Sequence, residues 1–197
     1  MIVGVREDFA IMVGNLNAEG LAMLHALPSA VNLGDWRPWE QSPLDGKSSG
    51  PATRDLLADW DLLVRPELEA QCDTYLNVVL ANLARVRRES SEEIRQSAAM
   101  FGVQEPGPHY AVEIAAEHVE AWYAVLNRAR LAIEALHHFA IIGWSPEEVE
   151  NLPENEQTHF WQSRMYGALQ EALLFSMEQQ FQGSTSTEDA PDDDDDL

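Results

Sequence analysis

The chain has 197 residues, 45% of them hydrophobic, and a formal net charge of −22. Seven of the acidic residues lie in the last ten positions, but the rest of the chain is also strongly acidic. Such a surface repels phosphate groups, which excludes sequence-independent binding to nucleic acids or to anionic membranes.

The single cysteine, Cys72, excludes an intramolecular disulfide and a cysteine-rich zinc site. No apolar run approaches the about 18 to 20 residues needed to span a bilayer, and the opening residues lack the regions of a signal peptide. We therefore expect a cytoplasmic protein without a membrane partner. The length suits one hydrophobic core, so we predict a single domain.

The amino-terminal part predicts one strand followed by an interrupted helix. The segment Phe9–Leu16 is short and apolar, and it ends with Gly14 and Asn15, which is typical of a strand leading into a turn. Asn17 stands where a helix N-cap is expected, and Pro28 predicts a break or kink near the end of that helix.

Residues 35–53 are rich in Pro, Gly and Ser, so we expect a loop insertion here. This loop contains Trp36 and Trp39. Two aromatic side chains in such a loop either fold it onto the domain, which we favour, or form an exposed interaction site.

Helical spacing of apolar residues resumes at Thr53, and residues 66–88 predict a longer helix that Pro66 opens. The predicted buried face of this longer helix consists of Leu68, Cys72, Tyr75, Leu76, Val79, Leu83 and Val86. Ser90 and Glu93 have capping-box spacing, which predicts a short helix over residues 91–100.

The second half of the chain predicts a strand and three helices. Apolar and other residues alternate over Tyr110–Ile114, and we expect this strand to pair with Phe9–Val13. A central helix is predicted over residues 116–139 and a last helix over residues 154–181. Between them, Ser145 followed by Pro and two Glu has the pattern of a helix start.

These elements predict a mainly α protein: a single helical-bundle domain over residues 1–183 with a small two-stranded β-ribbon. The acidic tail, residues 184–197, lacks apolar periodicity and repels itself, so we expect it to be disordered. The alternative is that the tail docks onto the basic cluster of Arg85, Arg87 and Arg88.

The central helix places polar residues within an apolar stripe. That stripe consists of Val119, Trp122, Tyr123, Leu126, Ala129, Ile133, Leu136 and Ala140. Arg130 falls within it and cannot lose its charge, so we expect it to be largely buried and paired with Glu171 or Asp73. Asn127 is predicted to be partly buried and to fasten the helix to a neighbouring irregular segment.

The same helix carries a family resemblance. The residues that carry it are Trp122, Leu126, Asn127, Arg130 and Leu131, with the segment around Glu171 in the last helix. They resemble a bacterial domain-of-unknown-function family best known from actinobacteria, whose pattern has an acid at the position of Arg128. The resemblance implies a small, mostly helical domain of no known activity. Genes of that family often lie near the Clp protease adaptor, which implies a partner linked to Clp-type proteolysis by association only.

Two Glu-x-x-His spacings point to the main enzymatic alternative, a di-metal carboxylate site in a helical bundle. They are Glu134 with His137 and Glu156 with His159. With the Glu and His content of this chain, such spacings also arise by chance, so we predict no metal and no other cofactor.

The sequence lacks the motifs that are typical of nucleophilic catalysis and of nucleotide hydrolysis. The sequence has no Gly-x-Ser-x-Gly elbow and no Gly-rich phosphate loop, and Cys72 lies on an apolar helix face where a thiol is usually inert. We therefore expect an interaction or regulatory protein without catalysis that binds an unknown protein partner, with homo-oligomerisation left open.

Overall fold

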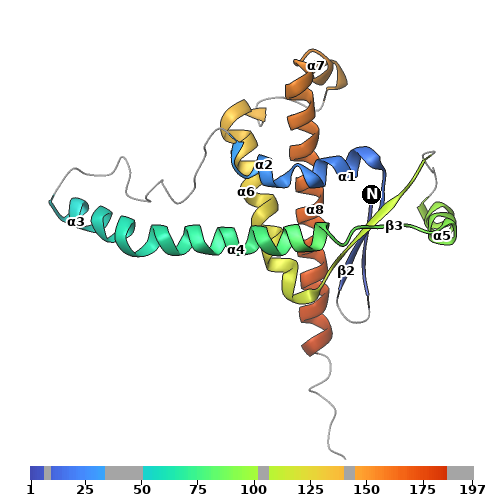
Figure 1. The fold of residues 1–197 in the computed structure, drawn as a ribbon, viewed down its shortest axis with the longest axis horizontal. Helices are drawn as coiled ribbons and strands as arrows, with labels where there is room; N and C mark the ends of the chain where they lie inside the picture. Colours follow the sequence, from blue (N-terminus) through green and yellow to red (C-terminus); the bar gives the residue numbers. More distant parts are fainter. Residues whose placement is uncertain (7–9, 34–50, 102–106, 140–144, 186–197) are drawn as a thin grey trace, which may run out of the picture.

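The computed structural model describes residues 1–6, 10–33, 51–101, 107–139 and 145–185. It is mainly helical, with one small sheet, and Figure 1 shows α4 crossing α6 and α8. The strands are β1 (Ile2–Val5), β2 (Ile11–Leu16), β3 (Arg87–Arg88) and β4 (Tyr110–Ile114). The helices are α1 (Ala18–His25), α2 (Leu27–Ala30), α3 (Pro51–Asp59), η3 (Trp60–Val64), α4 (Arg65–Leu83), α5 (Ser91–Phe101), η4 (Ala116–His118), α6 (Val119–His137), α7 (Pro146–Glu150) and α8 (Glu154–Thr185).

The sheet is antiparallel throughout, with strand order β1-β2-β4-β3. The predicted pairing of the two central strands is confirmed, since Ile11 lies opposite Ile114. The prediction of a two-stranded ribbon is wrong, because β1 and β3 add one strand on each side. β3 contains only Arg87 and Arg88, and the helical pattern of the preceding residues assigned both of them to the helix.

A local irregularity replaces the turn predicted after Val13. β2 continues through Gly14 and Asn15, and its register against β4 shifts between Val13 and Leu16. Asn15 adopts φ 52°, and its N–H donates to both carboxylate oxygens of Glu89, at 3.1 and 3.2 Å. A Cβ on Gly14 would lie 2.7 Å from Glu89 Oε1, so any other residue at position 14 would require the Glu89 side chain to shift.

The helix signals at the amino terminus are confirmed. The side chain of Asn17 accepts a hydrogen bond from the Gly20 N–H at 2.8 Å, which caps α1. α1 ends at His25, and Pro28 lies in the first turn of the separate helix α2, where its missing N–H costs no helical hydrogen bond.

Helices α3, η3 and α4 form one long rod, whose amino-terminal part projects beyond α6 and α8 (Figure 1). The rod begins at Pro51, so residues 51–53, which we assigned to the loop, are helical. η3 is a π-helical segment that ends just before Pro66. A wider turn there accommodates the proline ring, which would otherwise clash with the carbonyl one turn earlier.

The core surrounds α6, which packs against α8, α4 and α2. The largest fully buried side chains are Trp122, Tyr166, Phe160, Ile11, Leu16, Leu24, Leu27, Ile114, Leu126, Ile133, Leu169 and Leu173. Leu136, which we placed in the buried stripe, is 48% exposed, because α6 ends one residue later at a left-handed cap with φ 55° at His138.

Some of the remaining predictions can be compared with the structure, and others fall on residues that it does not describe. The capping box at Ser90 and Glu93 is confirmed, whereas Ser145 begins α7 without a side-chain hydrogen bond. α8 continues to Thr185 and so includes the first two residues of the predicted tail. Trp36, Trp39 and residues 186–197 lie outside the described residues. No helix in the described part of the chain is both long enough and apolar enough to cross a bilayer.

Candidate functional site

Trp122 and Leu126, two of the residues of the family resemblance, are structural. Both are buried, and the Trp122 indole N–H donates to Asn82 Oδ1 at 2.8 Å. The amide nitrogen of Asn82 lies 3.2 Å from His118 Nδ1. Asn82 on α4 therefore contacts both Trp122 in α6 and His118, the residue just before α6, and these polar contacts join the two helices.

Arg130 does not form the predicted ion pair. Its guanidinium donates to Gln170 Oε1 at 2.5 Å, and it is half-buried rather than largely buried. Glu171 and Asp73 are both exposed. The prediction failed by one position along α8: residue 170 faces α6, whereas residue 171 points to solvent.

The more deeply buried arginine of the central helix is Arg128, which is 8% exposed. Its guanidinium donates to Asn32 Oδ1 at 3.2 Å and lies close to Cys72. Burial raises the pKa of the Cys72 thiol, and the nearby arginine opposes this effect only in part. Fewer thiolates form at neutral pH as a result, which agrees with the expected inert thiol.

A cavity of about 240 Å³ opens between α6 and α8. We call it the α6–α8 cavity; it is lined by Asn127, Arg130, Leu131, Glu134, Phe139, Phe160, Ser163 and Arg164. Asn127 is half-buried, as predicted, but it makes no side-chain hydrogen bond to any described residue, so the predicted fastening is not seen.

The contribution of α8 to this cavity was missed from the sequence. Arg164 lies with its guanidinium carbon 5.2 Å from the centre of the Phe160 ring, which holds the cation over the aromatic face. Gly167, one turn further along, faces Arg130 across the interface. Residues 160, 163, 164 and 167 share one helical face, and this spacing is the signal that could have identified them.

The two predicted Glu-x-x-His motifs meet through their histidines. His159 Nδ1 lies 2.9 Å from His137 Nε2, and His137 stacks on Phe139 with 5.0 Å between ring centres. Burial and the neighbouring His137 lower the pKa of His159, while Glu156 acts in the opposite direction. The pair needs at least one neutral ring, because one nitrogen must accept the hydrogen bond.

A complete metal centre does not follow from this contact. Within the described residues, no group of three or more His, Cys, Asp or Glu side chains is placed to hold a metal ion. The structure thus brings together His137 and His159, two of the four residues that the sequence offered for the di-metal alternative, which also needs carboxylates from two further helices.

The outer part of the rod is unusual for its exposed apolar side chains. We call residues 55–69 the arm. Leu62 is 73% exposed and Leu63 is 63% exposed, and the other exposed large apolar residues of the arm are Leu56 and Val64. The apolar pattern that predicted this helix therefore reflects a face that no described element covers.

Comparison of the chain with family models, with curated proteins and with solved structures gave no match. The family resemblance of the central helix remains a prediction.

Proposed function

We propose that the protein is an interaction module that binds a partner protein through the arm, without catalysis. The observation that carries this proposal is the exposure of Leu62 and Leu63 on a helix that projects from the body. Exposed contiguous apolar groups of this kind typically mark binding surfaces. An amphipathic helix of a partner can bind to such a surface by packing its own apolar face against it.

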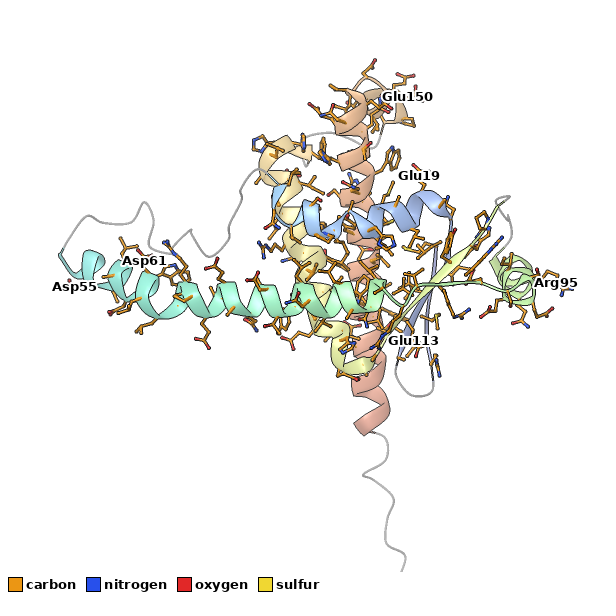
Figure 2. All side chains as sticks on the ribbon, in the orientation of Figure 1. Glu19, Asp55, Asp61, Arg95, Glu113 and Glu150 are labelled. Atoms are coloured by element: carbon orange, nitrogen blue, oxygen red, sulfur yellow. The ribbon has the colours of Figure 1, made fainter. Side chains whose placement is uncertain are left out.

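The charge of the arm defines the chemistry of the partner. The arm carries five acidic residues and one basic residue, Arg65, which pairs with Asp61 at 2.5 Å. Asp55, Asp59 and the remaining two acids form no ion pair with any described residue. Figure 2 shows Asp55 and Asp61 on the outer part of the rod.

An apolar surface edged by acids suits a basic amphipathic helix, whose lysines or arginines would face these carboxylates. A second copy of this chain is a poorer occupant, because it would bring the same acidic excess to the interface.

Two labelled synthetic peptides test the proposal. Both have leucines at helical spacing, but one has lysines and the other glutamates at the polar positions. Fluorescence anisotropy should show that the purified protein binds the lysine peptide and not the glutamate peptide. Binding should weaken as salt is added, because the carboxylates of the arm are solvent-exposed.

The variant Leu62→Glu/Leu63→Glu should reduce binding of the lysine peptide at least tenfold. Leu174→Glu is the matched control, since Leu174 is also exposed (43%) but lies on α8. Equal binding by the double variant and the control would contradict the proposal. A dimer in sedimentation velocity that the double variant abolishes would instead identify a second copy as the occupant.

The close contact of His137 with His159 favours one second candidate, the di-metal carboxylate enzyme with Glu134 and Glu156. Near-stoichiometric iron or manganese in the purified protein would support it.

The single-bundle organisation, a cytoplasmic location and a partner linked to Clp-type proteolysis stay predictions. One cooperative unfolding transition would support the first of these.

A further inference from the structure

We propose that the α6–α8 cavity binds a small organic carboxylate, at a site separate from the arm. The starting point is Arg130. Its partner within the described residues is the neutral amide oxygen of Gln170, and no described carboxylate forms an ion pair with it. A half-buried guanidinium cannot shed its charge, and it interacts most strongly with a carboxylate.

The balance of charge around the cavity supports an anionic ligand. Among the described residues of the lining, two side chains are guanidinium groups, Arg130 and Arg164, and one is a carboxylate, Glu134. The chain as a whole has 12 basic and 34 acidic residues, so a cavity with an excess of arginine departs from the composition of the molecule.

The rest of the lining defines the body of the ligand. Leu131, Phe139 and Phe160 provide apolar surface, while Asn127 and Ser163 offer neutral hydrogen-bonding groups. The volume of about 240 Å³ lies below the range of about 300 to 1,000 Å³ that is typical of sites for drug-sized ligands. These features favour a small molecule with an apolar body over a free inorganic anion.

The probes are benzoate, its neutral analogue benzamide, and inorganic phosphate. Each is titrated into the full-length protein at constant ionic strength, and binding is followed by NMR chemical shifts of backbone amides on α6 and α8. Benzoate should shift amides that flank the cavity and bind at least about tenfold more tightly than benzamide, because a hydrogen bond between two charged groups is stronger than one to a neutral amide. Phosphate should bind more weakly than benzoate.

Arg130→Gln should weaken benzoate binding at least tenfold. Arg95→Gln is the charge-matched control, because the Arg95 side chain is 73% exposed on α5 and away from the cavity. A second variant, Leu131→Trp, guards against misfolding of the first. Leu131 is 44% exposed, so a larger side chain is tolerated there but fills the cavity, and benzoate binding should be lost.

Several results would overturn the proposal. They are the absence of benzoate binding up to its solubility, equal affinity for benzamide, and affinity for phosphate that matches or exceeds that for benzoate. Equal weakening by Arg95→Gln and Arg130→Gln would show a general charge effect, and unchanged binding to Leu131→Trp would place benzoate elsewhere.

Discussion

Replacing Asn82 by alanine tests the buried polar cluster between α4 and α6. Asn82 is 4% exposed, and its side chain accepts the indole N–H of Trp122 at 2.8 Å. Alanine removes the acceptor but leaves the donor buried. Stranding a buried hydrogen-bonding group costs about 1–3 kcal/mol. His118 adds little to this cost, because its ring is only half-buried and water can replace the amide.

The free energy of unfolding is measured by urea denaturation followed by far-UV circular dichroism, which is independent of the indole environment. Asn77→Ala is the control, since Asn77 lies on the same helix but is exposed. The effect of Asn82→Ala should shrink in a Trp122→Phe background, where no donor is left to strand, and the coupling energy should be about 0.5–3 kcal/mol. A loss for Asn82→Ala no larger than that for Asn77→Ala would refute the reasoning.

Three further predictions concern titration and charge. The folded protein holds His159 with a lowered pKa, so unfolding takes up protons and stability should fall as the pH drops below about 6.5, the ordinary histidine pKa. His159→Gln should reduce the dependence of the melting temperature on pH in this range. An unchanged pH dependence would contradict the prediction. Hydrogen bonds from Arg87 and from Ser90 of the capping box lower the pKa of Glu93 to about 2. The contribution of Glu93 to the stability of the fold should therefore be present above about pH 4.5 and disappear as the pH falls towards 2. NMR titration of Glu93 and acid unfolding of Glu93→Gln check this. Deleting the predicted tail, residues 184–197, should leave the melting temperature unchanged or raise it slightly at low salt, because a block of negative charge is removed from an acidic chain. A drop in melting temperature at low salt that shrinks at high salt would favour docking of the tail onto the basic cluster.

The sequence predicted those parts of the candidate site that lie on one helix. Asn127 and Arg130 were identified because polar residues interrupt an apolar stripe, and both line the α6–α8 cavity. Gln170 and Arg164 could not be identified in the same way. They depend on how α8 is rotated about its axis against α6, and that rotation is set by the packing of both helices together.

The sequence alone predicted those structural features that depend on contacts between residues close together in the chain. The Asn17 cap, the break at Pro28 and the capping box at Ser90 each involve residues no more than about four positions apart, so the chain forms them without reference to the rest of the molecule.

Tertiary structure decided the features that join distant segments. Arg87 and Arg88 form a strand only because β4 is there to pair with them, and His137 meets His159 only because α6 and α8 lie side by side. The arm is a further feature that the sequence alone could not predict in full. Its apolar spacing predicts a helix, but a periodic pattern does not say whether another element covers the apolar face, and only the placement of the rod left Leu62 and Leu63 exposed.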